Sequence, residues 1–524
     1  MKFFTTEGPV NSRKHYCLPP LKRFDLEDIL RLILNEKYFL LHAPRQTGKT
    51  TCLMALTEYL NKEGKYRALY ANIETAQAAR ENVGQGIAAV VQAITEQARR
   101  QLKDDQIDCL GQKILAEKSA LVALEQFLSA WCEQSARPSV LMLDEVDALV
   151  GDTLISLLRQ LRSGYPSRPK LFPQSVILCG VRDIRDYRIH SSSEKAIITG
   201  GSAFNIKAKS LRLGDFTEPE VATLLYEHTR ETGQIFEPDA CKRVWMFTGG
   251  QPWLVNALAF ETCFEMKEGR NRACPITAEM ILQAKERLIQ ARATHLDQLA
   301  DKLREPRVRR VIEPMLAGQM IMDISDDDRQ YVIDLGLVKR DGSGGLIIAN
   351  PIYREVIPRT LAGGPQDSLP HISPTWLNPD GSLNTDNLLQ AFLAFWRQHG
   401  EPLMGSAPYH EIAPHLVLMA FLHRVVNAGG YIDREYAIGR GRMDLCVRYA
   451  GVILGIELKV WRDKEPDPLD EGLEQIDGYL LGLGQDTGWL VIFDRRGNRP
   501  RIRERTGTES ARTPSGKDIT VIRA

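Results

Sequence analysis

The sequence predicts an α/β protein of several domains, with a parallel-sheet domain first and a smaller α/β domain last. Short apolar runs alternate with helical periodicity through residues 38–180, a pattern typical of a parallel sheet covered on both faces. A lysine-bearing loop follows the first run, and an acidic cluster with a lysine lies near the C-terminus. At 524 residues the chain is too long for one hydrophobic core.

The composition limits the functional classes. Lys+Arg and Asp+Glu are equal at 67 each, so nucleic-acid binding would need local patches. One patch lies in residues 495–524, which contain nine basic and three acidic residues. A solvated tail and a phosphate-contacting segment are both open interpretations.

Nine cysteines without a CxxC pair favour reduced thiols. No segment is long and apolar enough for a membrane span, so we expect a cytoplasmic protein without membrane contact.

A phosphate-binding loop is expected between a strand at residues 38–42 and a helix that begins near Lys49. Backbone N–H groups of such a loop face the phosphates, Lys49 adds a positive charge, and the Thr50 hydroxyl can bind Mg²⁺. The usual first glycine is replaced by Ala43, which is small enough for the turn to close. The residues expected to bind the nucleotide are Ala43, Pro44, Arg45, Gln46, Thr47, Gly48, Lys49, Thr50 and Thr51.

A second apolar run, residues 139–144, ends in two acids. We expect Asp144 to hold Mg²⁺ through water and Glu145 to orient or activate the attacking water. Further strands are expected at residues 66–73 and 175–180, and a residue after the latter, at Gly180-Val181-Arg182, could sense the γ-phosphate.

The segments HAPRQTGKTT, LMLDEVDAL and MFTGGQPWLVNALA resemble the AAA-type ATPases of the archaeal-ATPase and STAND branch. The resemblance implies ATP as the nucleotide, a core over residues 1–215 and a helical lid over 216–294. In this branch a Gly-x-Pro element of the lid contacts the base, which assigns that role to Pro252, although the triplet also fits a plain helix N-terminus. Nucleotide-driven homo-oligomers are implied too, with an arginine finger among Arg159, Arg162, Arg182 and Arg185.

The middle of the chain predicts a winged helix and a linker. Residues 295–316 are helical and rich in arginine, and two short β-like runs flank residues 340–345, as in a wing hairpin. The ATPase resemblance also implies a winged helix, here over 295–361, and we favour a packing and switch role over DNA binding. Residues 362–386 are rich in Pro, Gly and Ser and predict a linker.

In the last domain, residues 387–524, a hairpin turn at residues 450–451 would pair positions whose numbers sum to 901. Asp444 then lies opposite Glu457, with Cβ atoms about 4.5–5.5 Å apart, and Lys459 shares their face. The other face is apolar and would pack on the core, leaving the acids outward. Opposed carboxylates are destabilising unless neutralised, which predicts a shared Mg²⁺. An exposed ladder of ion pairs is the structural alternative.

This arrangement resembles the PD-(D/E)xK nuclease superfamily, with Asp444 and Glu457-Leu458-Lys459 in the matching places and Met443 where proline is usual. The resemblance implies a restriction-endonuclease-like α/β domain in which Asp444, Glu457 and Lys459 are catalytic. Gln475, one turn before Tyr479, is the expected accessory catalytic residue. The further metal ligands implied are Glu411 and, as a competing choice, Glu435.

The two sites together predict an ATP-dependent or ATP-gated, Mg²⁺-dependent nuclease acting on DNA. The alternative is a STAND-like signalling switch whose last domain binds nucleic acid or protein without cutting. A purely mechanical translocase is disfavoured because no helicase-type motif accompanies the phosphate loop. A role in mobile-element biology or defence is implied by analogy alone.

Overall fold

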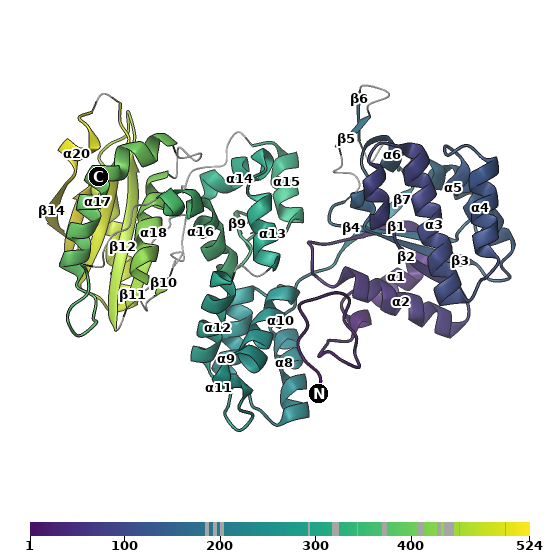
Figure 1. The fold of residues 1–524 in the computed structure, drawn as a ribbon, viewed down its shortest axis with the longest axis horizontal. Coiled ribbons are helices and arrows are strands. Elements are labelled where there is room, and N and C mark those ends of the chain that lie inside the picture. The colour runs from purple at the N-terminus through teal and green to yellow at the C-terminus, as the bar shows by residue number, and fades with distance from the viewer. Residues whose placement is uncertain are drawn as a thin grey trace. The chain divides into compact units, whose positions relative to one another are not determined.

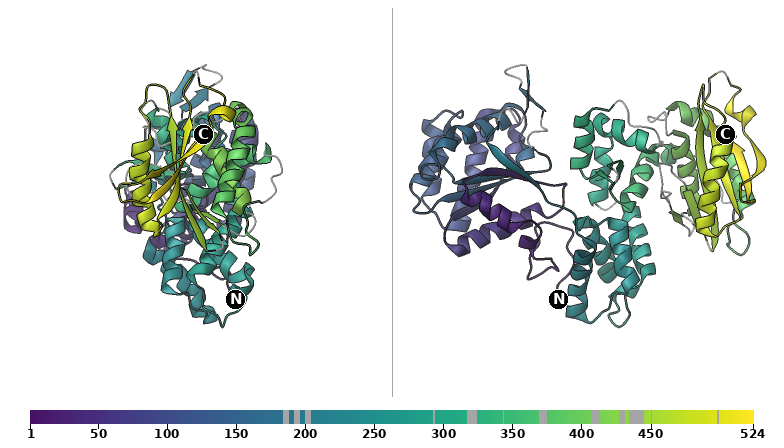
Figure 2. Two further views of the ribbon diagram at one scale, coloured as in Figure 1. Left: turned by 90° about the vertical axis from the view of Figure 1, so that its left-hand side faces the viewer. Right: turned by 180° about the vertical axis from the view of Figure 1, so that it is seen from behind.

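The computed structural model describes residues 1–524 except 184–187, 192–195, 200–203, 292–293, 317–323, 343, 369–374, 407–412, 427–430, 434–444, 450 and 498. It divides into two compact units, one formed by residues 1–293 with 329–351 and the other by 294–328 with 352–524. Figure 1 shows the order of the elements along the chain, and Figure 2 shows further views of them. Within the described residues, no helix has both the length and the apolar character needed to cross a membrane.

The first unit is built on a parallel sheet with the strand order β2-β3-β4-β1-β7, which confirms the parallel-sheet prediction. Strand β4 therefore lies between β1, which leads into the phosphate loop, and β3, which ends in the acidic pair. All the residues of β1, β3 and β4 are buried, as their continuous apolar sequences require. The strands are β1 (Tyr38–His42), β2 (Arg67–Asn72), β3 (Ser139–Asp144), β4 (Ser175–Gly180) and β7 (Lys207–Arg212).

Helices cover both faces of this sheet, because alternate residues of each strand point to opposite sides. On β1, Phe39 and Leu41 pack in one core with helices α1 (Leu26–Leu34) and α2 (Lys49–Glu63). Tyr38 and Leu40 pack in the other core. Its helices are α3 (Val83–Leu102), α4 (Ile107–Glu117), α5 (Ala123–Glu133) and α6 (Gly151–Gly164). A ribbon of β5 (Arg188–Ser191) and β6 (Ala196–Thr199), which the sequence did not predict, precedes β7.

The predicted lid region is helical. Thr217 and Glu220 form a reciprocal capping box at the start of its first helix, and the Gln251 side chain accepts from the Leu254 N–H at the start of α10. A π-helical turn, Glu261–Glu265, follows α10. The helices are α8 (Glu218–Thr232), α9 (Pro238–Thr248), α10 (Pro252–Phe260), α11 (Lys267–Arg270) and α12 (Ala278–Gln290).

The region predicted as a winged helix contributes to both units. Residues 329–351, which belong to the first unit, contain an antiparallel hairpin of β8 (Val338–Arg340) and β9 (Leu346–Ile348) around the expected wing turn. Helix α15 (Asp326–Asp334) leads into them. Helices α13 (Thr294–Lys302), α14 (Pro306–Leu316) and α16 (Pro351–Ser368) lie in the second unit or begin at its edge.

The segment predicted as a linker is partly structured. Helix α16 continues to Ser368, and after residues outside the described part Trp376 is buried and Leu377 bridges to Leu383. The linker prediction relied on Pro, Gly and Ser content, whereas burial of large apolar side chains decides the structure of residues 375–386.

The second unit contains a mixed sheet with the order β10-β11-β12-β13-β15-β14. Helix α19 (Leu469–Leu483) covers one face through Ile476 and Leu480. Helices α17 (Thr385–Ser406) and α18 (Ala413–Val426) place Trp396 and His415 against Phe493 from the other. The strands are β10 (Tyr431–Asp433), β11 (Leu445–Tyr449), β12 (Val452–Trp461), β13 (Thr487–Asp494), β14 (Gly507–Arg512) and β15 (Asp518–Arg523), with a short helix α20 (Ile502–Arg505).

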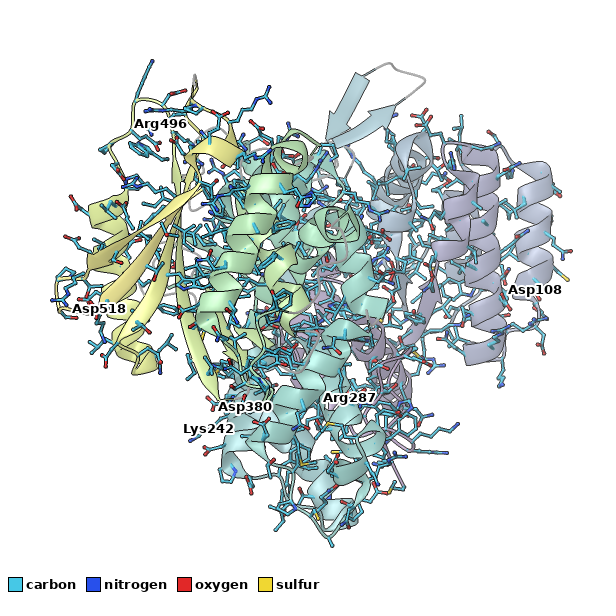
Figure 3. All side chains as sticks on the ribbon, turned by 60° about the vertical axis from the view of Figure 1, so that its left-hand side comes forward. Asp108, Lys242, Arg287, Asp380, Arg496 and Asp518 are labelled. Atoms are coloured by element: carbon cyan, nitrogen blue, oxygen red, sulfur yellow. The ribbon has the colours of Figure 1, made fainter. Side chains whose placement is uncertain are left out.

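The basic C-terminal segment is not a solvated tail. Strands β14 and β15 pair as an antiparallel edge hairpin, and Arg523 lies 2.7 Å from a Glu509 oxygen. Arg496, which is labelled in Figure 3, binds both oxygens of Asp494 and stacks on the Trp461 ring at 3.1 Å. Four of the nine basic residues of this segment, Arg496, Arg512, Lys517 and Arg523, pair with carboxylates.

Candidate functional site

The phosphate loop between β1 and α2 has the geometry that its sequence predicts. Gly48 has φ +93°, a left-handed conformation that a side chain would strain, and it immediately precedes α2. Lys49 is buried, and its Nζ donates to the backbone oxygens of Ala43 at 2.9 Å and Pro44 at 3.0 Å. The Thr47 hydroxyl also donates to Pro44 O. These bonds hold the lysine against the loop at the N-terminus of α2, where a phosphate would be favoured.

Asp144 is the centre of a buried polar cluster at the end of β3. Its Oδ2 accepts from the Thr50 hydroxyl at 2.7 Å and from the Tyr70 hydroxyl at 3.0 Å. The structure thus brings together Thr50 and Asp144, both predicted as Mg²⁺ ligands and 94 positions apart in the chain. A carboxylate oxygen and a hydroxyl oxygen side by side are ligands that Mg²⁺ prefers, so the residues fit the ion. Tyr70 on β2 was not predicted, because a tyrosine within an apolar strand gives no signal of its partner.

Glu145 directly follows this cluster. Its φ of +59° is a left-handed conformation that is uncommon for a non-glycine residue. Burial raises the pKa of its carboxyl, and the nearby charges of Asp147 and Asp144 add to the effect. A carboxyl whose pKa is raised toward the working pH is suited to accepting a proton from water.

The end of β4 connects the loop to residues 329–351 of the same unit. Gly180 O accepts from Ala43 N–H at 3.3 Å, and Asp147 Oδ1 accepts from the next backbone N–H, that of Val181. Arg182 is buried, lies 3.8 Å from Asp334 and stacks over Tyr331 at 4.8 Å.

The phosphate loop itself touches the same segment. A Cβ on Gly336, whose φ is +78°, would come within 2.7 Å of Pro44. The Arg212 guanidinium, at the end of β7, donates to Ile333 O at 3.4 Å. Of the other arginine-finger candidates, Arg159 and Arg162 are exposed on α6, and Arg185 lies outside the described residues.

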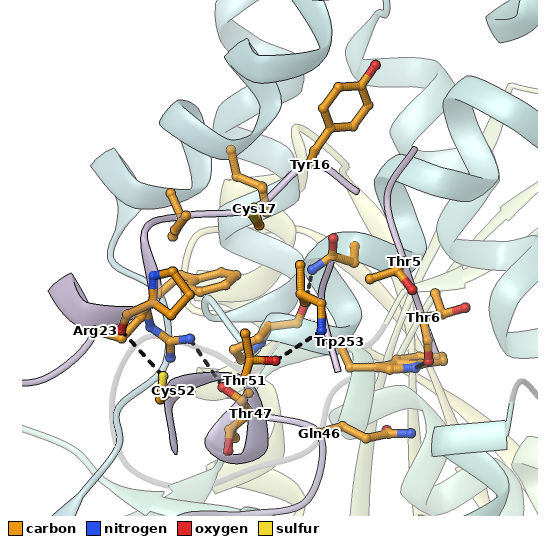
Figure 4. A pocket seen from close by; sticks show the side chains of 18 of the residues that line it. Thr5, Thr6, Tyr16, Cys17, Arg23, Gln46, Thr47, Thr51, Cys52 and Trp253 are labelled. Atoms are coloured by element: carbon orange, nitrogen blue, oxygen red, sulfur yellow. Dashed lines mark hydrogen bonds between the residues drawn. The ribbon is translucent and has the colours of Figure 1, made fainter. Parts of the chain in front are cut away.

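A cavity of about 140 Å³ lies beside the phosphate loop and under the lid (Figure 4). The N-terminal segment closes it: Thr6 O accepts from the Trp253 indole at 2.9 Å, and the Thr51 hydroxyl accepts from Val10 N–H at 3.1 Å. The predicted base contact, Pro252, is in the wall. The other residues in the wall, most of them not predicted, are Thr5, Thr6, Glu7, Gly8, Val10, Tyr16, Cys17, Leu18, Pro20, Arg23, Gln46, Thr47, Gly48, Thr51, Cys52, Phe216, Leu224, Trp253 and Asn256.

Arg23 connects the phosphate loop to the segment at residues 214–216 on the wall of this cavity. It donates to Thr47 O of the phosphate loop at 3.2 Å and to Gly214 O at 2.7 Å, and it stacks over the Phe216 ring at 4.4 Å. Burial lowers the pKa of its guanidinium, which nevertheless stays charged because arginine titrates far above neutrality. No sequence pattern around Arg23 predicts these contacts, which depend on the fold.

In the second unit, the predicted hairpin register is confirmed over the described residues. Leu445 pairs with Ile456 and Tyr449 with Val452, so that paired numbers sum to 901. On β12, the Lys459 ammonium lies 3.2 Å from Glu457 Oε1 and bonds Gln475 Oε1 of α19. The structure therefore brings together Glu457, Lys459 and Gln475, as predicted.

The expectation that this cluster faces outward is wrong. Glu457 has no exposed surface and Lys459 is 5% exposed. The opposite, apolar face does pack against α17 and α18, but helix α19 covers the acidic face as well. Both Glu457 oxygens lack a partner in hydrogen-bond geometry although the lysine is within ion-pair distance. A buried carboxylate with open acceptor positions fits a cation, so these residues are compatible with Mg²⁺.

The remaining predicted metal ligands are not placed. Asp444, Glu411 and the competing Glu435 lie outside the described residues. Among the residues that the structure does describe, no three His, Cys, Asp or Glu side chains gather into a metal site. The Asp444–Glu457 pairing therefore stays a prediction.

No curated protein matches the chain. Its fold is similar at TM-score 0.45 and 14% identity to a Walker-type ATPase of Pyrococcus abyssi, covering 68% of this chain and 99% of that one. It is also similar to the Holliday junction branch migration motor RuvB of Thermotoga maritima (TM-score 0.32, 12% identity, 64% and 95% covered) and to Cdc6p of Pyrobaculum aerophilum (TM-score 0.35, 13% identity, 77% and 93% covered). At such scores these likenesses carry no argument about function.

Residues 33–187 match the family described as an AAA domain. The matched range runs from the last residues of α1 through β4 to residue 187, and so includes the phosphate loop, the Thr50–Asp144 contact and Glu145. The N-terminal region of this chain is therefore a P-loop ATPase domain of the AAA class.

Proposed function

We propose that the chain is an ATP-gated, Mg²⁺-dependent nuclease that acts on DNA. The N-terminal unit would bind and hydrolyse ATP, and the C-terminal domain would cleave phosphodiester bonds. The observation that carries the nuclease assignment is the gathering of Glu457, Lys459 and Gln475 at one point between β12 and α19. It is supported by the hairpin register that, from the sequence, would set Asp444 opposite Glu457.

At the first site, each residue has a definable role. Lys49 would exchange its bonds to loop carbonyls for the β- and γ-phosphate oxygens, which neutralises charge where it develops. Mg²⁺, when bound, would supply further charge neutralisation at the phosphates. Thr50 and Asp144 would hold it, while Tyr70 keeps Asp144 in position. Glu145 would orient the attacking water and accept its proton.

At the second site, Lys459 is placed to stabilise negative charge. Its ammonium would face the non-bridging phosphate oxygens of a cut strand or orient the attacking water, and Gln475 would fix its direction. Mg²⁺ would supply charge neutralisation and lower the pKa of a bound water, held by Glu457 and Asp444. Lys459 is buried and bonds Gln475 of α19. Helix α19 would therefore have to move before a substrate could reach the ammonium.

In this proposal, ATP binding would control the nuclease domain through residues 329–351. They contact Pro44 of the phosphate loop through Gly336 and the end of β4 through Arg182. The chain then continues directly into α16, which belongs to the second unit. A phosphate bound at the loop and a shift at Pro44 would therefore change the packing of the segment that leads to the nuclease domain.

A second candidate is a signalling switch whose last domain does not cut. It is favoured by the burial of Glu457 and Lys459, which neutralise each other without any metal. A buried pair of this kind also occurs as a purely structural feature.

Cleavage of linear, circular and single-stranded DNA with Mg²⁺, with and without ATP, separates the two candidates. ATP-dependent cutting that disappears in Lys459→Ala while ATP hydrolysis persists supports the nuclease. Cutting that persists in Lys459→Ala would refute the site. No cutting under any of these conditions, with ATP hydrolysis retained, would favour the switch.

A further inference from the structure

The cavity beside the phosphate loop contains a buried acceptor without a partner. Asn256 on α10 lines the cavity and is 9% exposed. Its Nδ2 donates to Pro252 O at 2.8 Å, which fixes the orientation of the amide because only the NH₂ group can donate to a carbonyl. Its Oδ1 is buried and has no hydrogen-bond partner. Among the residues lining the cavity, all of which are described, no other side chain has such an atom.

An unpaired acceptor in this position has an energetic cost. A buried acceptor left without a donor destabilises the protein, and proteins satisfy nearly all such groups. A ligand that brings an N–H group to Asn256 would recover this loss. Binding would be favoured by the new hydrogen bond and by the fact that Asn256 Oδ1 is no longer unpaired.

We propose that Asn256 is the base-selecting residue of the site and accepts a hydrogen bond from the exocyclic amino group of adenine. This inference rests on the proposed binding of a nucleotide at the phosphate loop. Adenine carries a donor at its 6-position, whereas guanine and hypoxanthine carry a carbonyl acceptor there. Two acceptors facing each other repel, so the site would discriminate against the oxo bases.

The surroundings suit a base at this position. The cavity that Asn256 lines also includes the rings of Phe216 and Trp253 and the side chain of Leu224, which offer apolar contact to a planar ring. At about 140 Å³, the cavity is smaller than the roughly 300–1,000 Å³ of pockets that enclose a whole drug-sized ligand. It would take the base, while the phosphates lie over Gly48 and Lys49.

Recognition of adenine by Asn256 would also involve the lid, because Asn256 lies on lid helix α10. Pro252, whose carbonyl holds the Asn256 amide, follows Gly250, where a Cβ would come within 1.8 Å of Phe216 O. The turn before α10 is thus fixed closely against Phe216, and this in turn limits the freedom of Asn256. A hydrogen bond from adenine to Asn256 would therefore act on the first turn of α10, because the same amide bonds Pro252 O.

The test compares three ligands on the full-length protein by calorimetric titration with Mg²⁺. These are ATP, inosine triphosphate, which has an oxygen in place of the amino group, and purine riboside triphosphate, which has hydrogen there. We expect wild-type protein to bind ATP about tenfold more tightly than purine riboside triphosphate, the effect of one buried hydrogen bond. Inosine triphosphate should bind at least as weakly as the latter.

The variants locate this preference. Asn256→Leu, which removes the acceptor while filling the space, should bind ATP and purine riboside triphosphate equally. Asn256→Gln keeps both the acceptor and the NH₂ donor of the amide and should keep the preference for ATP. Gln283→Ala, which removes an exposed amide from lid helix α12, should behave as wild type. The ratio of affinities does not depend on the fraction of protein that is folded, so partial misfolding cannot imitate the result.

Two results would count against the proposal in different ways. If wild-type protein binds the three ligands equally, or Asn256→Leu retains the preference for ATP, the role of Asn256 is refuted and nucleotide binding stands. If wild-type protein binds none of them, both the proposed nucleotide site and the base selection are refuted.

Discussion

The two polar sites of this chain use similar residues in opposite settings. At the first, Lys49 begins helix α2 directly after the phosphate loop and Asp144 ends strand β3. Each is held by neutral groups: backbone carbonyls for the lysine, hydroxyls for the aspartate. At the second, Glu457 and Lys459 lie within β12 under helix α19 and pair with each other. The first site keeps its charges available for a ligand, whereas the second has already neutralised its own.

This difference sets what each site requires in order to act. Neutral hydrogen bonds to Lys49 can be exchanged for phosphate oxygens without leaving an unpaired buried charge. Separating Glu457 from Lys459 would leave each charge buried and unpaired unless a cation or phosphate replaces the partner. Both sites are buried, with Lys49 6% and Asp144 0% exposed. They therefore differ in how their charges are neutralised and not in how far they are exposed.

The largest effect should come from the phosphate-loop lysine. In Lys49→Ala, ATP hydrolysis should fall by about 10²–10³-fold or more, as when one preorganised charge-stabilising group is removed. Phosphate release measured on the full-length protein gives the rate. Lys62→Ala, an exposed lysine on the same helix, should keep wild-type activity. An unchanged rate in Lys49→Ala would contradict the assigned role.

The buried pair should show a large effect on stability. Lys459→Met leaves Glu457 charged, buried and unpaired, which should cost about 3–5 kcal/mol, whereas replacing both residues in Glu457→Leu/Lys459→Met should be near neutral. Hydrogen exchange of the β12 amides reports this local stability in the intact chain. If Glu457 binds Mg²⁺, the ion should raise the protection of Lys459→Met and leave that of the double variant unchanged. Equal protection in the single and double variants without metal would show that the pair is not coupled.

The pH dependence of ATP hydrolysis should reflect Glu145. Its buried position raises the pKa of the carboxyl above the ordinary value of 4.5, and the proposed base must be deprotonated. The rate should therefore fall as the pH drops through this raised pKa, by about tenfold per unit below it. The check is the acid limb of the kcat profile, which should disappear from the residual activity of Glu145→Gln. Persistence of the same limb in that variant would assign it to another group.

The smallest effect is expected at the edge of the second sheet. Arg512 and Asp518 form a pair whose side chains are 76% and 70% exposed, and exposed pairs contribute little. Arg512→Ala should change the free energy of unfolding by no more than about 0.5 kcal/mol, measured by urea denaturation. A clearly larger loss would show that the basic residues of this hairpin stabilise the domain in a way that the exposed geometry does not explain.

The sequence by itself determined the elements whose signals are local. The strand-loop-helix at residues 38–63, the acidic end of β3 and the β11–β12 register were predictable because periodicity, a glycine-bearing turn and a fixed pairing rule act over neighbouring residues. The AAA-class domain follows from the same local patterns. The Asp444–Glu457 pairing was predicted in the same way and remains a prediction.

Only the tertiary structure decided which distant residues meet and which faces are covered. Tyr70 reaches Asp144, and Arg23 joins the phosphate loop to the start of the lid, through contacts between segments far apart in the chain. The alternation of polar and apolar side chains along β12 predicted one polar face. It could not show that α19 would cover that face and bury Glu457 and Lys459. The physical reason is that burial depends on what packs against a strand, and a strand's own sequence records only which side each residue takes.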